Sequence, residues 1–256
     1  MKRRILYIKP SSYSTVNEAI KQYLEEYKLE DTVIEVVNVP KGPKHLESSC
    51  YEALAAAEIL KLVLWAEKKN YDGAIIGCFK DPILRAAREA CGRLCVVGPA
   101  EASVLLAASL GYKFSIIVGR NSWIPDMEDN IYKYGMQKRL ASFRSLNMGV
   151  LEFHKDEVLT ARVMRREIKA ALEEDRAEVI ILGCTMNFGF FEELQKEFKV
   201  PVIDPMLAAL KNLEMLIEVR DKMSWYSSKI GGYATPDRKE IKDWHIEEDF
   251  DMKGLW

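Results

Sequence analysis

The sequence predicts an α/β fold of two pseudo-symmetric lobes, each a parallel four-stranded sheet flanked by helices, with the active site in the cleft between them. Short β-branched stretches alternate with longer amphipathic stretches along the chain, and this alternation is typical of parallel sheets with covering helices. One pattern of strand, cysteine and helix occurs in both halves. No Ser/Pro-rich or low-complexity linker separates the halves, so we expect them to pack closely.

Eight stretches rich in Val, Ile and Leu are the expected strands, because such residues fit a buried, pleated surface. In chain order they cover residues 5–8, 33–37, 74–77, 94–97, 114–118, 146–153, 179–183 and 200–203. Between them, stretches such as 51–69 and 158–174 place apolar residues three and four positions apart, with charges on the other side. This spacing predicts helices that cover the sheets. Gly and Pro residues at most strand ends mark the turns.

The internal repeat is the most informative feature of the sequence. Residues 74–78 read AIIGC and residues 180–184 read IILGC, so two predicted strands end in Gly-Cys. In both halves a proline that precedes a helical stretch follows the cysteine, Cys78 or Cys184, by 21 residues. A shared order of strand, cysteine, helix, strand, proline and helix indicates duplicated lobes that face each other across a cleft.

The length of the chain fits two such lobes. With 256 residues, 48% of them apolar, the chain is long enough to bury a core without disulfides. We assign residues 1–98, together with a C-terminal helix and tail at 206–256, to the first lobe, and residues 99–205 to the second. The charged tail at 235–256 carries three aromatic residues, which are expected to anchor it on the lobe surface or to form a contact in an oligomer. We expect a homo-oligomer.

Charge and hydropathy limit the classes of partner. The 37 basic and 39 acidic residues give a net charge of −2, which provides no broad positive field for nucleic acid phosphates. The longest uncharged stretch, residues 179–191, has 13 residues, whereas a membrane-spanning helix needs roughly 18 or more. The first apolar stretch stops at Lys9, too early for an export signal. We expect a soluble, cytoplasmic protein with a small-molecule substrate, no nucleic acid partner and no membrane partner.

The five cysteines are expected to be reduced thiols, since an odd number without dense spacing does not fit a secreted disulfide scaffold. Cys50, Cys91 and Cys95 are expected to pack in the core as small hydrophobic residues. The three histidines lie far apart, and no Cys-x-x-Cys or His-x-x-x-His pair accompanies them. We therefore expect no metal site.

Cys78 and Cys184 are the candidate catalytic residues. In open parallel sheets the ligand crevice lies beyond the carboxyl ends of the strands, where both thiols would face the cleft. Each precedes an expected helix N-terminus, where free N–H groups and the helix dipole favour a thiolate. One thiolate and one thiol on opposite faces of a stereocentre would invert it by removing and returning a proton alpha to a carbonyl. This chemistry needs no metal and no organic cofactor.

Fixed donors are required for the enolate oxygen that forms in such a reaction. The backbone N–H groups after each cysteine and the hydroxyl of Thr185 are the candidates, because helix starts present unpaired N–H groups to anions. Two other interpretations of Cys78 and Cys184 stay open. They could pack in the core as inert thiols, or they could form a disulfide with each other.

At these residues the sequence resembles the aspartate/glutamate racemase superfamily, and within it most of all the hydantoin and allantoin racemases. Residues 77–82 (GCFKDP) are similar to the Cys-Phe-Gly-Asp-Pro segment of that family, with Lys80 in place of glycine. Residues 97–102 (VGPAEA) are similar to its Val-Gly-x-x-Glu-Ala segment, and residues 183–185 (GCT) to its second cysteine motif. Residues 227–234 (SSKIGGYA) resemble its C-terminal Ser-Lys-x-Gly-x-Tyr signature.

The resemblance implies a cofactor-independent racemase or epimerase, an isomerase that acts on 5-substituted hydantoins or a related cyclic ureide. It also implies that Ser11 and Ser12 line the cleft and that Phe79 and Thr185 lie beside the cysteines. Phe79 and Met186 are expected to form an apolar wall. Two departures concern substrate contacts. The family's Asn-Pro-Asn is replaced here by residues 9–11 (KPS), and Met186 fills a position that is small in the family.

Other functions stay open at this point. They are an aspartate/glutamate-type amino-acid racemase, a maleate-isomerase-like enzyme with a nucleophilic cysteine, and a non-catalytic small-molecule binding module. An amino-acid ammonium would need an acidic partner, which residues 10–12 do not supply, although Asp81 would serve if it points into the cleft. Lys80 has two expected roles, as a binder of an anionic substituent or as a solvated charge at a helix start.

Overall fold

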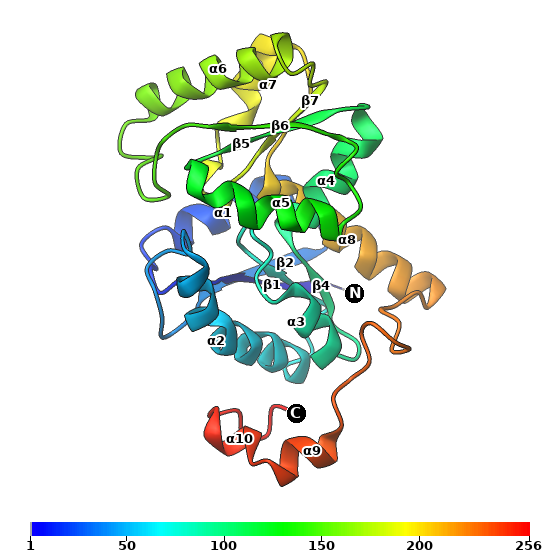
Figure 1. The fold of residues 1–256 in the computed structure, drawn as a ribbon. Coiled ribbons are helices and arrows are strands. Elements are labelled where there is room, and N and C mark those ends of the chain that lie inside the picture. Colours follow the sequence, from blue (N-terminus) through cyan, green and yellow to red (C-terminus); the bar gives the residue numbers. More distant parts are fainter. Residues whose placement is uncertain (1) are drawn as a thin grey trace.

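The computed structural model describes residues 2–256 and contains two four-stranded sheets (Figure 1). The first sheet has the order β2-β1-β3-β4, with β1 at Arg3–Lys9, β2 at Thr32–Asn38, β3 at Gly73–Ile76 and β4 at Cys95–Val97. The second has the order β6-β5-β7-β8, with β5 at Phe114–Val118, β6 at Leu140–Ser145, β7 at Val179–Leu182 and β8 at Val202–Ile203. Neighbouring strands are parallel in both sheets. The second half repeats the strand order of the first, which confirms the predicted fold class.

Helices flank both sheets, as the apolar spacing predicts. Two of the long helices, α2 (Ser49–Lys68) and α6 (Glu157–Glu173), each follow an N-cap residue, Ser48 and Asp156, whose side chain accepts a hydrogen bond from a backbone N–H near the start of the helix. Such N-caps satisfy donors that the helix itself leaves unpaired. The other flanking helices are α1 (Asn17–Tyr27), α3 (Leu84–Ala90), α5 (Ile124–Lys133) and α7 (Phe191–Phe198), with short 3₁₀ turns at Asn121–Trp123 (η1) and Thr185–Asn187 (η2).

Two helices connect the lobes by crossing between them. Helix α4 (Pro99–Leu110) follows β4 of the first sheet but packs on β7 and β5 of the second. Helix α8 (Pro205–Met223) follows β8 of the second sheet but packs on β4 and β3 of the first. The two helices also pack against each other between the sheets (Figure 1). The crossing holds the two sheets together as one body.

Buried aspartates cap both crossing helices, but they come from different places in the chain. Asp204 directly precedes α8 and accepts the N–H groups of its first turn at 2.8 and 3.2 Å. Gly98 stands at the matching position before α4, and there the carboxylate of Asp81 accepts two first-turn N–H groups at 2.9 and 2.8 Å. A Cβ at Gly98 would lie 2.4 Å from the carboxyl carbon of Asp81. Asp81 is thus used as a helix cap, and the ammonium-binding role considered from the sequence is not available to it.

We expect Gly98→Ala to destabilise the protein, because its methyl group would displace the carboxylate that caps α4. Overpacking together with loss of a cap predicts a decrease of about 2 kcal/mol or more in the free energy of unfolding. Urea unfolding followed by circular dichroism measures this decrease. Gly92→Ala is the matched control, since a Cβ there comes no closer than 3.4 Å to another atom. Equal stability of the two variants would contradict the assigned cap.

The prediction of a strand at residues 146–153 is wrong. The strand in this region is β6, which ends at Ser145, and the predicted residues form a loop. Strand β6 lies at the edge of its sheet and mixes polar with apolar residues (LASFRS), all half-buried, so it carries no continuous apolar signal. Asn147 has a φ of 55°, which breaks extended backbone. Leu146 and Phe153 are buried as anchors of the loop.

Among the cysteines expected in the core, Cys91 is buried and Cys95 is half-buried, but the prediction for Cys50 is wrong. Cys50 lies in the first turn of α2 and is exposed, because the buried face of that helix begins further on, at Ala55. All five cysteines are free thiols, Cys78 and Cys184 included.

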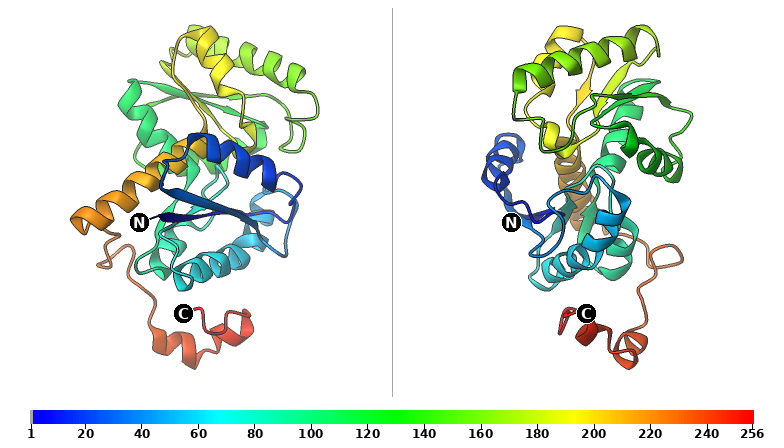
Figure 2. Two further views of the ribbon diagram at one scale, coloured as in Figure 1. Left: turned by 180° about the vertical axis from the view of Figure 1, so that it is seen from behind. Right: turned by 60° about the vertical axis from the view of Figure 1, so that its left-hand side comes forward.

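The C-terminal tail extends away from the sheets and carries two short helices, α9 (Arg238–Asp243) and α10 (Ile246–Asp249), drawn in red in Figure 1 and seen from two further sides in Figure 2. Lys229 ties the start of this segment to the first lobe by donating to the backbone carbonyl of Arg88 at 2.6 Å. Within residues 2–256 no helix combines the length and the apolar character needed to cross a membrane.

Candidate active site

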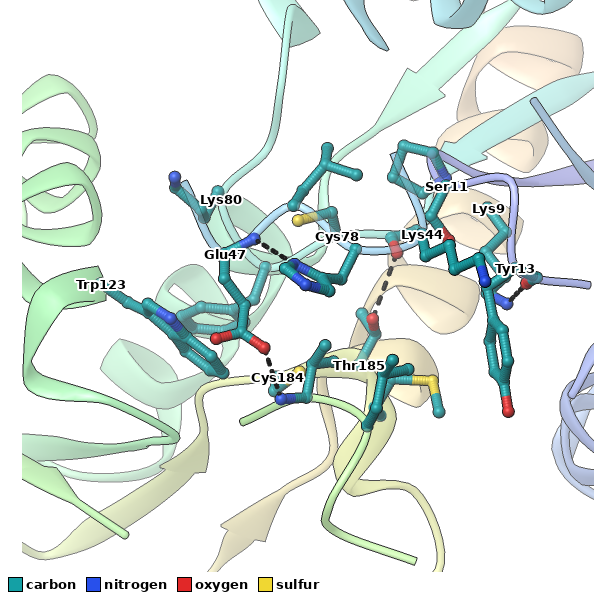
Figure 3. A pocket seen from close by; sticks show the side chains of 18 of the residues that line it. Lys9, Ser11, Tyr13, Lys44, Glu47, Cys78, Lys80, Trp123, Cys184 and Thr185 are labelled. Atoms are coloured by element: carbon teal, nitrogen blue, oxygen red, sulfur yellow. Dashed lines mark hydrogen bonds between the residues drawn. The ribbon is translucent and has the colours of Figure 1, made fainter. Parts of the chain in front are cut away.

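The two candidate cysteines occupy equivalent places in the two lobes. Cys78 lies two residues beyond the end of β3, and Cys184 lies two residues beyond the end of β7. Each strand is an inner strand of its sheet. Both cysteines line one pocket between the lobes (Figure 3). The structure therefore brings together the residues that the repeat singles out.

Close packing at the preceding glycines fixes the path of the chain at both strand ends. A Cβ at Gly77 would lie 2.4 Å from the ring of Tyr7, and a Cβ at Gly183 would lie 2.8 Å from Ile116. Because no larger residue fits without displacing these neighbours, the chain passes tightly over the adjacent strand before it reaches each cysteine. This explains the glycine that precedes each cysteine.

The surroundings of the thiols disfavour the thiolate. Burial raises the pKa of Cys78 to about 12, opposed by a hydrogen bond that its sulfur accepts from the backbone N–H of Lys80. Burial also raises the pKa of Cys184, opposed in the same way by the N–H of Met186. The expected helix N-termini are not adjacent, since α3 begins at Leu84 and α7 begins only at Phe191. The prediction that helix starts favour the thiolates is wrong: burial raises both pKa values, and each sulfur accepts one backbone N–H group instead.

Thr185 connects the two strand ends. Its hydroxyl donates to the backbone carbonyl of Gly77, in the other lobe, at 3.1 Å. The hydroxyl hydrogen is therefore already used in this structure, which differs from the free oxyanion donor expected from the sequence. Thr185 still lines the pocket beside Cys184, and its bond holds the two Gly-Cys segments next to each other.

Of the other residues expected at the cleft, Ser11, Phe79 and Met186 line the pocket. Ser12 does not belong to its lining. The hydroxyl of Ser12 donates to the backbone carbonyl of Gly42 at 2.8 Å. Ser12 thus joins the segment after β1 to the loop at 40–47 rather than facing the pocket.

Lys80 fits neither role expected from the sequence. Its ammonium is buried and pairs with Glu52 of α2 at 3.1 Å and with Asp126 of α5 at 2.5 Å. Burial alone would lower the pKa of Lys80, but these two carboxylates raise it above its usual value. Because Asp126 belongs to the second lobe, the pair links the lobes directly beside Cys78.

Several pocket residues were not identified from the sequence. On one side they include Trp123, Met127 and Val150 of the second lobe, which give the pocket an apolar wall. Glu47, at its edge, accepts the N–H of Val150 at 2.9 Å and pairs with Arg120 at 3.1 Å. These residues come from loops and from a helix start, where no periodic pattern marks them.

A further group lies at the opposite end of the pocket and consists of Lys9, Tyr13 and Lys44. Lys9 is the last residue of β1. Ligands bind beyond the carboxyl ends of parallel strands, so the strand-end position that identified the two cysteines could also have identified Lys9 from the sequence. Within residues 2–256, no group of three or more His, Cys, Asp or Glu side chains is arranged to hold a metal ion.

Comparisons with known proteins agree with this fold. A family model described as Asp/Glu/Hydantoin racemase matches residues 5–213. The hydantoin racemase of Pseudomonas sp. (strain NS671) is 35% identical over 237 residues, which are 93% of this chain and 93% of that protein. The hydantoin racemase of Paenarthrobacter aurescens is also 35% identical, over 93% of this chain and 99% of that protein. The solved structure of allantoin racemase from Klebsiella pneumoniae matches with a TM-score of 0.86 at 29% identity, covering 93% of this chain and 95% of that one.

Proposed function

The chain belongs to the Asp/Glu/hydantoin racemase family, and from this we propose that it is a cofactor-independent racemase or epimerase of 5-substituted hydantoins or a related cyclic ureide. The observation that carries the proposal is the pair Cys78 and Cys184, at equivalent strand ends in one pocket. The hydantoin and allantoin racemases among the similar proteins support a cyclic ureide as the substrate.

In the proposed reaction the two cysteines act on opposite faces of one carbon. The thiolate of one cysteine removes the proton alpha to the carbonyl, and the electron pair of the C–H bond moves toward the carbonyl oxygen to give an enolate. The thiol on the other face then delivers its proton to the same carbon. Afterwards the first cysteine is a thiol and the second a thiolate, so the reverse reaction uses the same groups with their roles exchanged.

The groups around the sulfurs support these roles of the two cysteines, one as the base and the other as the acid. The N–H groups of Lys80 and Met186 oppose the effect of burial on the thiol pKa values, and they stabilise whichever sulfur is charged. We propose that Ser11, Phe79, Thr185 and Met186 contact the substrate, and that Ser12 acts indirectly, by holding the loop at 40–47 in place.

We propose the same division into lobes as the sequence suggests, with residues 1–98 and 206–256 in the first and residues 99–205 in the second. The packing of α8 on the first sheet and of α4 on the second supports these boundaries.

We further propose a cytoplasmic homo-oligomer. Free thiols support the reducing compartment, and the exposed apolar residues of α4, Leu105, Leu106 and Leu110, support a contact with a second subunit.

The proposed function is tested by incubating single enantiomers of 5-substituted hydantoins with the protein in deuterated water. We expect deuterium at the carbon alpha to the carbonyl, together with loss of optical rotation, at rates well above those in the same solution without protein. Conversion of maleate to fumarate would identify a maleate isomerase instead. Absence of any reaction with hydantoins, cyclic ureides and free amino acids would contradict the proposal and leave a binding module.

Removal of metal ions is expected to leave this activity unchanged, because thiols carry the proton in the proposed reaction. The measurement compares racemisation before and after exhaustive chelation with EDTA followed by gel filtration. A loss of activity that added zinc restores would contradict the proposed chemistry.

A further inference from the structure

One end of the pocket holds a buried ammonium without a negative partner. Lys9 is only 6% exposed, and its Nζ donates to the backbone carbonyl of Tyr13 and lies 4.7 Å from the centre of the Tyr13 ring. Throughout residues 2–256, no carboxylate lies within 4.0 Å of this ammonium. Burying an unpaired charge is costly, and burial lowers the pKa of Lys9 to about 8. An ammonium has three N–H donors, so two remain for a ligand.

Other donors lie at the same end of the pocket (Figure 3). Ser11 is buried and lines the pocket, and no hydrogen bond within the described chain uses its hydroxyl. Lys44 is exposed at the mouth of the same pocket and has no ion-pair partner in residues 2–256. Figure 3 shows Lys9, Ser11 and Lys44 on one side of the pocket and Glu47 on the other. The backbone N–H of Ser12 donates to the carbonyl of Pro43 at 2.9 Å, which holds the two loops together.

The other carboxylate and the other ammonium of the pocket lining, Glu47 and Lys80, have ion-pair partners inside the protein. Glu47 pairs with Arg120, and Lys80 pairs with Glu52 and Asp126. Lys9 and Lys44 are therefore the positive charges of the pocket lining that have no carboxylate partner within residues 2–256. A pocket that carries such charge favours a ligand with a negative group at the same place.

We propose that Lys9, Ser11 and Lys44 bind a carboxylate on the ring substituent, so that the preferred substrate is a cyclic ureide with an acidic side chain. This inference rests on the proposed function and narrows its substrate class. One carboxylate oxygen accepts from Lys9 and the other from the Ser11 hydroxyl, while Lys44 closes the mouth. Hydrogen bonds to charged groups of this kind change affinity by about 10- to 100-fold.

The test uses two hydantoins that differ only at the end of the substituent, one with a carboxyethyl group and one with its neutral carboxamide. Calorimetry measures their dissociation constants for the wild type and for Lys9→Gln, Lys44→Gln and Lys41→Gln, and a parallel assay measures racemisation. Lys41 is the matched control, because it is exposed on the same loop and does not line the pocket. Thermal unfolding shows which variants are folded. If Lys9→Gln does not fold, the binding ratio of Lys44→Gln alone tests the proposal.

We expect the wild type and Lys41→Gln to bind the carboxylate at least about 10-fold more tightly than the amide. This ratio falls to about one in Lys9→Gln and decreases in part in Lys44→Gln. Equal binding of the two compounds by the wild type, or an unchanged ratio in both pocket variants, overturns the proposal.

The two readouts separate this inference from the proposed function. Racemisation of the amide without preference for the carboxylate contradicts only the carboxylate site. Lys9-dependent binding of the carboxylate without racemisation of either compound contradicts only the proposed function. Lys9-dependent racemisation of free glutamate, with no racemisation of either hydantoin, would overturn the acidic cyclic ureide as the substrate class.

Discussion

Cys78→Ser and Cys184→Ser are each expected to lower racemisation by about 10²- to 10⁴-fold, the range in which a positioned acid or base contributes to catalysis. Serine is nearly the same size as cysteine, but its hydroxyl is far less acidic than a thiol, so almost no oxyanion is present near neutral pH to act as a base. Both serines fit the half-buried positions. The proteins should therefore stay folded while the reaction stops.

Chiral chromatography of a racemising hydantoin measures the activity, and thermal unfolding by circular dichroism measures the fold. Cys50→Ser is the matched control, since Cys50 is exposed on α2 and is not part of the pocket. It is expected to retain full activity. Full activity in Cys78→Ser or in Cys184→Ser would contradict the mechanism in which both thiols transfer protons.

The features that sequence patterns predicted are those that short segments encode. Alternating strands and helices, and two strands that end in Gly-Cys, follow from local composition, and the structure contains both. Parallel strands place their carboxyl ends at the same edge of a sheet, so Cys78 and Cys184 each lie at that edge of their own sheet. The packing of the two lobes places both in one pocket. The edge strand β6 carries too little apolar signal to be recognised, because one sheet neighbour and partial exposure require few hydrophobic residues.

The features that were missed depend on contacts between distant segments. Lys80 forms ion pairs with Glu52 and Asp126, which lie on two different helices. No local sequence pattern predicts these contacts. The same holds for the thiol pKa values, because burial in the assembled pocket outweighs the single N–H group that each sulfur accepts. For Lys9, only the absence of a partner in three dimensions distinguishes a buried, unpaired ammonium from an ordinary lysine at a strand end.

The second prediction concerns the two halves of the reaction. If Cys78 and Cys184 face opposite sides of the stereocentre, each thiolate removes a proton from one enantiomer only. A variant with one remaining cysteine can still exchange the proton on its own side with solvent, but it cannot return a proton from the other side. We therefore expect each serine variant to exchange the alpha proton of one enantiomer for deuterium without inversion. The enantiomer that exchanges is expected to differ between the two variants.

The most direct test of the account is to follow deuterium incorporation and optical purity together, for each enantiomer of one hydantoin with each variant in deuterated water. Two stereospecific exchangers of opposite preference, both without inversion, are the predicted result. If both variants exchange the same enantiomer, or if every exchange is accompanied by inversion, Cys78 and Cys184 do not lie on opposite faces of the substrate.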